Sequence, residues 1–491
     1  MKKRKPWYRA RNVVLLILAA GLIWLAWAVY FAMTAKPGNA IDYAQRITEL
    51  ARNAQPGDID GPNRWDDYIA EFADFYSLAL AGAAPGTKAL GQSPDISYAY
   101  DTSRFETPQD AEIARLEALA NLKALRESGV FERADAFVPA GPIYRQYTKD
   151  ELVAFVLMPD LSYSRVFARV NRAEFHTAIA EARDDDALRC VRRALSLAKV
   201  PINGPNLISW LVGIAQYGIL FEGIREETLA GHLSPETARR ILDELNKVKI
   251  RSGEIAIEGE RLGILDIVER SFTDDGHGGG ILLVTEVPEG QFNGNNQARH
   301  PRITNLMGFF LPGKKDTVDS VNEVYDFALR CIKESPAEQQ RLLADFVGWA
   351  ERRLKSTYLP LEVLIPAFDR AFSNYEACVN DLALTRVGLA LSIYNSEHGE
   401  YPESLDQLVP NVFPALPKDR FTSDGTYGYV KRAATPDDPR EFLLYSFGFD
   451  GVDHRGTLPR GGIAPSHAYS PGYEGTDFVF NPNPLATDAD Q

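Results

Sequence analysis

Acidic residues that lie close to a histidine in the sequence are the candidates for hydrolytic chemistry. Glu174 lies two positions before His176, and Asp274 and Asp275 come just before His277. A carboxylate and an imidazole that converge in space can act as a general base and a general acid. These three acids are therefore the residues that a hydrolase built on this chain would use.

No complete catalytic or metal-binding motif accompanies these acids. The sequence contains neither His-Glu-x-x-His nor the Gly-x-Ser-x-Gly elbow, which zinc proteases and α/β-hydrolases require. Glu174 and His176 are two residues apart and so cannot share one face of a helix, which argues against a zinc pair. The run His277-Gly278-Gly279-Gly280 is typical of a flexible loop. A hydrolase is therefore the alternative hypothesis, and a role other than catalysis is favoured.

The elements that would position these residues begin with an apolar, N-terminal segment. Val13 to Met33 is a run of 21 residues without a charge. As a helix with a rise of about 1.5 Å per residue, it can cross a hydrocarbon core of about 30 Å. The competing interpretation is a cleaved signal peptide, whose apolar core is normally only about 7–15 residues long. The sequence therefore predicts a transmembrane anchor at residues 13–33.

Charge sets the expected orientation of this anchor and excludes one class of partner. Residues 1–36 carry a net charge of +7, which leaves −21 of the total of −14 on residues 37–491. An acidic body argues against nucleic acid as a partner. Because six basic residues precede the apolar run, we expect the N-terminus in the cytoplasm and residues 37–491 outside it. The chain has no Asn-x-Ser/Thr sequon, which favours the bacterial inner (cytoplasmic) membrane and a periplasmic body.

Residues 37–365 are predicted to form a helical extracytoplasmic domain. Helix starts are marked by Thr107-Pro108, Ser234-Pro235 and Ser335-Pro336, each a capping residue followed by a proline suited to the first turn. Leu207 to Phe221 is apolar on nearly every side but has only 15 residues, so we expect a buried central helix. The chain has three cysteines, far apart in the sequence, and we expect them to be buried free thiols.

The C-terminal region, residues 366–491, is predicted to be a small α+β domain. A long helix starts near Pro366 and is ended by Gly399. Strands at 427–430 and 442–446 are separated by a polar turn, which indicates an antiparallel pair. The Pro- and Gly-rich tail from Gly461 onward is expected to be extended or disordered. The fold class is thus mainly α, with a transmembrane helix, a large helical middle domain and this small α+β domain.

This C-terminal order of residues resembles the globular head of the major pseudopilin of type II secretion systems. The resemblance covers about 100 residues and rests on an ordered set: Ala390, Leu391, Tyr394, Gly399, Tyr401, Pro402, Leu405, Leu408, Leu416, Pro417, Asp419, the strand pair, and then Ser446, Gly448, Asp450 and Gly451. Two features depart from the family. Its Asp-Pro-Trp is Asp419-Arg420-Phe421 here, and the apolar helix lacks the glutamate that follows a prepilin-peptidase site. The resemblance therefore implies a pseudopilin-like head on an anchored helical domain.

The resemblance also implies a metal site and a role. In that family the loop after the last strand commonly binds calcium, and the matching positions here are Asp450, Asp453 and, after an insertion, Asp477. Calcium takes about six to eight oxygen ligands. The expected function is a membrane-anchored scaffold or partner-binding protein of the bacterial envelope, linked to secretion, with other envelope proteins as partners. An envelope hydrolase with its site in the helical domain is the alternative.

Overall fold

A computed structural model describes most of the chain. The described residues are 6–38, 41–55, 60–81, 107–137, 141–153, 158–284, 302–353, 364–458 and 475–485. Helices dominate these ranges, and one small antiparallel sheet lies near the C-terminus. The predicted fold class is thus confirmed at this level: a mainly helical protein with a small α+β region.

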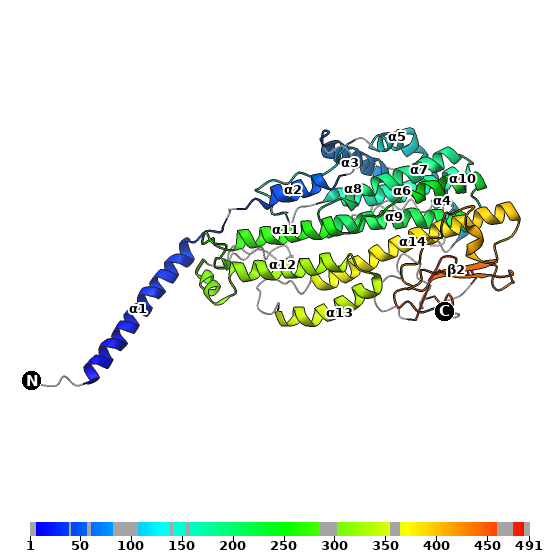
Figure 1. Ribbon diagram of the computed structural model, residues 1–491. Coiled ribbons are helices and arrows are strands. Elements are labelled where there is room, and N and C mark those ends of the chain that lie inside the picture. Colours follow the sequence, from blue (N-terminus) through cyan, green and yellow to red (C-terminus); the bar gives the residue numbers. More distant parts are fainter. Residues whose placement is uncertain are drawn as a thin grey trace, which may run out of the picture.

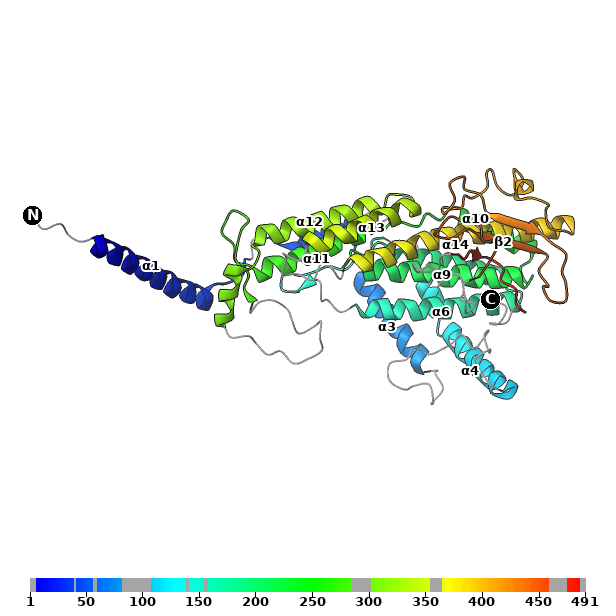
Figure 2. The same ribbon diagram turned by 90° about the horizontal axis from the view of Figure 1, so that it is seen from below.

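The protein has an elongated body, and helix α1 (Pro6–Thr34) runs away from one end of it (Figure 1). Helices α3 and α4 lie on the opposite side of the body from α12 and α13 (Figure 2). The helices of the body up to residue 353 are α2 (Tyr43–Asn53), α3 (Trp65–Ala81), α4 (Pro108–Glu127), α5 (Val130–Asp135), α6 (Pro159–Ala180), α7 (Asp184–Leu197), α8 (Lys199–Ile202), α9 (Leu207–Leu229), α10 (Pro235–Asn246), α11 (Glu254–Ser271), the 3-10 helix η5 (Arg302–Phe310), α12 (Lys314–Cys331) and α13 (Pro336–Arg353).

The predicted capping signals open helices as expected. The Thr107 side chain accepts a hydrogen bond from the N–H of Asp110 at the start of α4. Ser234 does the same for Thr237 at the start of α10. In both cases a proline occupies the first turn, where its missing N–H leaves no bond unmade. These local signals fix where the helices begin without help from tertiary packing.

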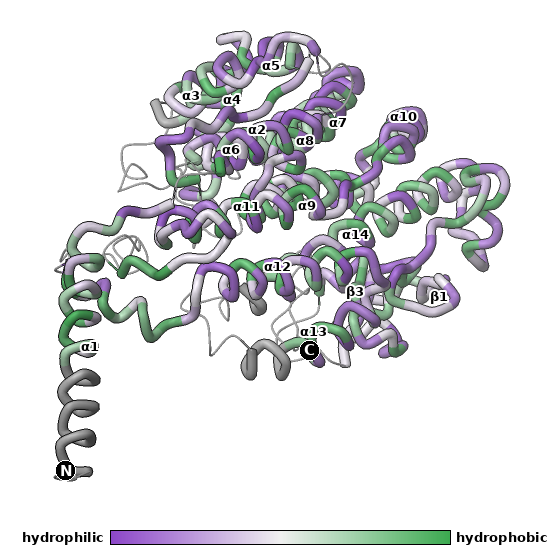
Figure 3. The backbone as a smooth tube through the Cα atoms, turned by 60° about the vertical axis from the view of Figure 1, so that its left-hand side comes forward, coloured by the Kyte–Doolittle hydropathy of each residue, from purple (hydrophilic) through white to green (hydrophobic). Residues whose placement is uncertain are grey.

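Helix α9 lies at the centre of the body and packs against α6, α8, α11 and α14. Within the part of the chain that the structure describes, α9 is the helix long and apolar enough to cross a membrane, but 67% of its apolar window is buried inside the protein. The prediction of a buried central helix is confirmed. Helix α1 contains a shorter apolar stretch, Ala19–Thr34, and hydrophobic residues occupy the turns of α1 nearest the body (Figure 3). The membrane span at residues 13–33 stays a prediction.

The C-terminal region is built on the long helix α14 (Leu364–His398), followed by the 3-10 helix η8 (Leu405–Leu408). Gly399 ends α14 with a φ of 77°, a left-handed conformation that glycine adopts without steric cost. Strands β1 (Gly428–Lys431), β2 (Phe442–Ser446) and β3 (Phe478–Val479) form an antiparallel sheet with β2 in the middle. The predicted long helix and strand pair are confirmed.

One hydrophobic core runs through the helical body and the C-terminal region. It extends from Tyr43 on α2 through α9 and α14 to Phe480 after β3. All three cysteines are buried and free, as predicted. A second cluster, which includes Phe72, Leu122 and Phe167, lies among α3, α4, α5 and α6. The domain boundary expected at residues 365 and 366 stays a prediction.

Of the two states predicted for the tail from Gly461, extended or disordered, residues 475–485 are ordered and include the extended strand β3. Phe478 and Val479 pair with β2, and the Phe480 side chain is buried. The Asn481 side chain completes the pairing, since it accepts from the N–H of Leu444 and donates to the carbonyl of Phe442. Burial of these apolar side chains offsets the entropy of ordering a Pro- and Gly-rich segment. The part of the predicted tail at 461–474 and 486–491 lies outside the described residues.

Replacing Gly388 by alanine should destabilise the protein through the C-terminal segment. A Cβ atom at Gly388, on α14, would lie 2.1 Å from Cζ of Phe480. We expect Gly388→Ala to lower the free energy of unfolding by about 1–3 kcal/mol, the usual cost of overpacking. Chemical denaturation of the purified chain would measure it.

A matched control is Gly218→Ala on α9, where an added Cβ meets no atom within 4 Å. This variant should be neutral or more stable, by up to about 1 kcal/mol, because alanine favours a helix over glycine. In a Phe480→Ala background the cost of Gly388→Ala should disappear. Equal costs of Gly388→Ala with and without the Phe480 ring would show that the two residues do not touch.

Candidate functional site

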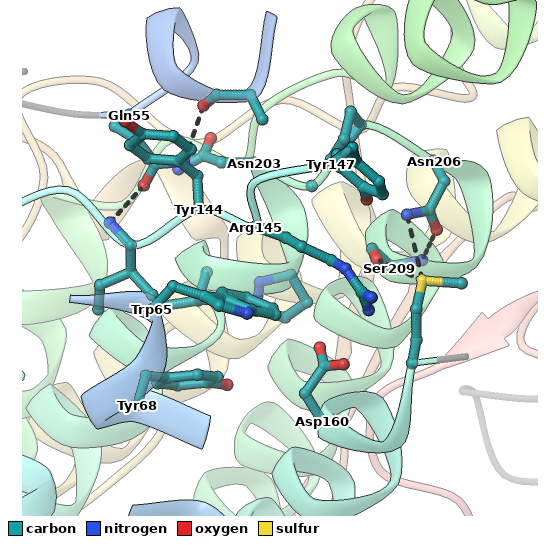
Figure 4. Close-up of a pocket in the computed structure, with 17 residues that line it drawn as sticks. Gln55, Trp65, Tyr68, Tyr144, Arg145, Tyr147, Asp160, Asn203, Asn206 and Ser209 are labelled. Atoms are coloured by element: carbon teal, nitrogen blue, oxygen red, sulfur yellow. Dashed lines mark hydrogen bonds between the residues drawn. The ribbon is translucent and has the colours of Figure 1, made fainter. Parts of the chain in front are cut away.

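A small cavity that holds several polar side chains lies where four parts of the helical body meet (Figure 4). Trp65 and Tyr68 of α3 form one wall, and Arg145 comes from the extended segment after α5. Asp160 lies in the first turn of α6, and Ser209 lies in the first turn of α9. Helix starts gather unsatisfied N–H groups and the positive end of the helix dipole. The cavity is therefore a place where negative charge and polar ligands are favoured.

Asp160 is the most unusual group in this cavity. Its side chain is 7% exposed, and its Oδ1 atom has no hydrogen-bond partner among the described residues. Figure 4 shows the Arg145 side chain pointing toward this carboxylate across the cavity. Burial raises the pKa of the Asp160 carboxyl, and the positive charge of Arg145 opposes that rise. A buried, incompletely bonded carboxyl with a raised pKa is a candidate for a functional group.

Two tyrosines share the electrostatic environment of Asp160. Burial and then the negative charge of Asp160 raise the pKa of the Tyr68 hydroxyl. Burial raises the pKa of Tyr147 to about 12. The cavity volume is ≈ 30 Å³, the share of about one water molecule in the liquid. This site can hold a water or ion between Asp160 and the tyrosines, whereas ligand pockets are typically about 300–1,000 Å³.

The acids predicted for a hydrolase are occupied by other groups and do not meet in space. Glu174 is buried on α6, where Arg126 donates two hydrogen bonds to it at 3.1 and 2.8 Å and Arg183 donates one at 3.1 Å. Asp274 and Asp275 accept backbone N–H bonds within their own exposed loop. Among the described residues no contact joins Glu174 to this loop. A carboxylate held by two guanidiniums is a structural ion pair.

His176 belongs to a different cluster, as its spacing from Glu174 predicted. Its ring lies between Glu226 and Glu227 of α9, with Nε2 3.2 Å from Oε2 of Glu226 and Nδ1 in contact with Glu227. Burial lowers the pKa of His176, but hydrogen bonds to these two glutamates outweigh it and raise the pKa above its usual value. Glu227 also bonds His232 at 2.8 Å. The sequence did not single out this cluster, because α6 and α9 are about 50 positions apart in the chain.

The predicted calcium ligands gather around the loop after β2. Oδ2 of Asp450 accepts a hydrogen bond from the N–H of Gly475 at 3.0 Å and lies 2.9 Å from Nε2 of His454. Gly475 follows the insertion that separates Asp453 from Asp477. The structure thus brings the two ends of the insertion together, which the resemblance requires if Asp477 is to join the other two acids.

The other two acids are also bonded within this loop. Oδ1 of Asp453 accepts from the hydroxyl of Tyr445 at 2.9 Å. Asp477 accepts from the N–H groups of His454 and Gly456 at 3.3 and 2.6 Å. Burial raises the pKa of Asp477 to about 6, and the charge of Asp453 adds to the rise. Near neutral pH the loop therefore carries negative charges that repel one another.

The loop that carries Asp450, Asp453 and Asp477, called the acidic loop below, suits a cation by its charge. The present arrangement of its carboxylates does not form a metal site. Within the described residues, no group of three or more His, Cys, Asp or Glu side chains is arranged to hold a metal ion. Each of the three carboxylates already accepts hydrogen bonds, and a calcium ion would have to replace several of these donors. Calcium at Asp450, Asp453 and Asp477 therefore stays a prediction.

A larger groove lies at the end of the body that is distant from α1. Its volume is ≈ 440 Å³, and it is bordered by the end of α9, by α14 and by the C-terminal sheet. Its lining mixes apolar and polar groups: Leu229, Ser392, Tyr401, Arg440, Phe442 and Pro484 are among them. We call this feature the distal groove. A groove of this size and composition can take a small ligand or a short stretch of another protein.

Comparisons with known proteins leave these sites without a precedent. No protein-family model, no curated protein and no solved structure matches this chain. The pseudopilin resemblance therefore rests on the residues quoted for it.

Replacing Asp160 by asparagine should stabilise the protein at neutral pH. Because folding raises the pKa of this carboxyl, its contribution to stability is greatest below the unfolded pKa of about 3.9 and falls as the pH rises through the folded pKa. We expect Asp160→Asn to gain about 0.5–2 kcal/mol near neutral pH and nothing below pH ~4. Denaturant unfolding of both proteins across this pH range measures the difference.

The matched control is Asp135→Asn. Asp135 accepts from Nε and Nη2 of the buried Arg193 at 2.6 and 2.9 Å, so this variant should lose stability at neutral pH because it removes the negative charge that balances a buried guanidinium. A wild-type protein that is more stable than Asp160→Asn near pH 7 would show that Asp160 supports the fold.

Calcium should raise the melting temperature of the full chain if the acidic loop binds it. The test is best made above the pKa of Asp477, where all three carboxylates are charged. A ligand at about 100 times its dissociation constant adds about 2.7 kcal/mol to the stability of the folded state. The shift should be reversed by chelator and absent in Asp450→Asn.

Asp424→Asn is the control for this experiment, since Asp424 likewise accepts hydrogen bonds in a short turn but lies outside the loop. It should keep the calcium response. No shift in the wild-type chain, or a shift that survives Asp450→Asn, would remove calcium from this loop.

Proposed function

We propose that this chain is a membrane-anchored, extracytoplasmic scaffold or partner-binding protein of the bacterial envelope. In this proposal α1 holds the protein in the inner membrane, with the N-terminus in the cytoplasm and residues 37–491 in the periplasm. The observation that carries the proposal is the separation of two features: α1 leaves one end of an elongated body, and the distal groove lies at the other (Figure 1).

The apolar run and the charge around it support the anchor. The side chains of Leu22, Ile23 and Tyr30 of α1 are exposed. Exposed apolar side chains are unfavourable in water and favourable in a bilayer. The basic residues before the run match the side that usually stays in the cytoplasm. With α1 in the membrane, the opposite end of the body extends into the periplasm.

The distal groove supports a role in binding another protein. Leu229 and Leu485 are exposed near it, and Tyr401 and Phe442 line it beside the charged Arg440. Aromatic and arginine side chains with apolar neighbours are typical of the energetic centres of protein interfaces. The pseudopilin resemblance of residues 366–491 suggests that the partner belongs to an envelope assembly such as a secretion system.

Photo-crosslinking in living cells tests both parts of the proposal. A photoreactive residue at Ser392 would lie in the distal groove. The same residue at Ser396 would lie one turn further along α14, outside the groove. We expect a discrete crosslinked protein from position 392 and none from position 396, because of the two only Ser392 lines the groove.

Protease treatment of the same cells tests the orientation. The body should resist protease in intact cells and be cleaved once the outer membrane is permeabilised, while the segment before α1 stays protected. Equal crosslinking at positions 392 and 396 would argue against the groove as the binding surface. Protection of the body after permeabilisation would place it in the cytoplasm and contradict the anchor's orientation.

A further inference from the structure

The 3-10 helix η5 lies beside the C-terminal half of α1. The Phe309 ring sits among three aromatic rings of α1, with ring centroids 6.0 Å from Trp24, 5.8 Å from Trp27 and 5.5 Å from Phe31. Ala28 and Ala32, one turn apart on α1, are fully buried. Small residues at this spacing allow another segment to approach a helix closely. Within the described residues, α1 thus has a packed partner in η5.

Hydrogen bonds and a glycine fix η5 between α1 and the body. The Asn305 amide donates to the carbonyl of Ala32 at 3.1 Å, and Arg302 donates to the carbonyl of Met33 at 2.9 Å. On the other side, a Cβ at Gly308 would lie 2.0 Å from the carbonyl oxygen of Leu282. The backbone of η5 therefore lies directly on the body, and its position relative to α1 is set by both neighbours.

Three apolar side chains of η5 are exposed. Phe310 is 83% exposed, Met307 is 57% exposed and Ile303 is 42% exposed. In a 3-10 helix, residues three positions apart lie above one another, so Met307 and Phe310 share a face. Neighbouring apolar side chains that are exposed together are a feature of interaction surfaces.

We propose that η5 is a second membrane-contacting element, whose exposed face enters the periplasmic leaflet of the inner membrane beside α1. The proposal rests on the proposed function, since it takes α1 to be the anchor. Trp24 lies ten residues before the end of α1, which is about 15 Å along a helix. A segment in contact with Trp24 is then at the depth of lipid acyl chains. A helical backbone satisfies its own hydrogen bonds there, as that depth requires.

Lipid is the occupant that the geometry favours. Leu22, Ile23 and Leu25 of α1 are also exposed, and η5 packs beside α1, so one apolar medium can cover both elements. Arg302, at the other end of η5 and near the end of α1, would lie at the level of the head groups, where a long basic side chain is favourable. The two elements together match the layering of a membrane surface.

Quenching of a fluorophore by lipid tests the proposal on the full chain in vesicles of phosphatidylethanolamine and phosphatidylglycerol. The fluorophore is attached to a cysteine at position 310, 23 or 452, since the native cysteines are buried. Position 310 samples η5, position 23 samples α1, and Val452 is an exposed apolar residue of the C-terminal loop. Quenchers on the acyl chains should reduce emission at 310 and 23 to a similar extent, and leave position 452 unaffected.

The three positions separate failure of this inference from failure of the proposed function. Quenching at 23 but not at 310 would overturn the role of η5 and leave the anchor intact. Absence of quenching at both positions would overturn the anchor and, with it, the membrane contact of η5. A label at 310 that is shielded from lipid, together with crosslinking between copies at that position, would show that a second chain covers η5.

A charge at the same position provides an independent readout. Phe310→Glu should loosen η5 from α1 and move its exposed end out of the acyl region, because a carboxylate in that region is costly. A fluorophore at position 307 should then lose its quenching by acyl-chain quenchers, while position 23 keeps it. Val452→Glu is the matched control and should change neither. Unchanged quenching at 307 in Phe310→Glu would also overturn the proposal.

Discussion

The fold depends on α14, a helix of 35 residues that must bury its side chains against both the helical body and the C-terminal sheet. Such a helix cannot keep a polar face, so its polar groups need partners inside the protein. Asp381 is buried against Arg225 of α9 at 3.0 Å. Glu376 is fully buried and is bonded by Arg420 and by Gln339. Removing one member of such a pair usually costs about 3–5 kcal/mol, so these contacts tie the register of α14 to both neighbours.

Arg420 gives a physical reason for one departure from the pseudopilin pattern. Where that family has proline, this chain has the guanidinium that neutralises Glu376 on α14. The neighbouring Asp419 is buried and accepts hydrogen bonds from the N–H groups of Phe421 and Phe447, so it organises the turn before the sheet. Arg420 and Glu376 both belong to residues 366–491, so this ion pair holds the turn before the sheet against the long helix of the same region.

The sequence predicted those features that depend on neighbours in the chain. Caps such as Ser234, the stop at Gly399 and the strand pair are local, and the structure confirms them. The order of residues 475–485 depends on contacts with β2 and Gly388, which lie 30 or more positions earlier. The cavity around Asp160 is likewise assembled from segments that lie far apart in the sequence. The spacing of Glu174 and His176 indicated only that these two residues do not act together. Proximity of an acid to a histidine in the sequence does not reveal groups that meet only after folding.

The contacts of η5 also determine how the body is oriented relative to α1. The last carbonyls of a helix lack partners within the helix, and at the end of α1 two of them accept bonds from Asn305 and Arg302. A basic side chain at a helix C-terminus also interacts favourably with the helix dipole. Because η5 lies directly on Leu282 of the body, these bonds make a stiff joint between α1 and the rest of the protein. If α1 spans the membrane as we propose, the joint fixes the angle of the body, so the distal groove would be presented at a defined height and direction. Such fixed geometry favours a scaffold role, because binding of a partner then loses less orientational entropy.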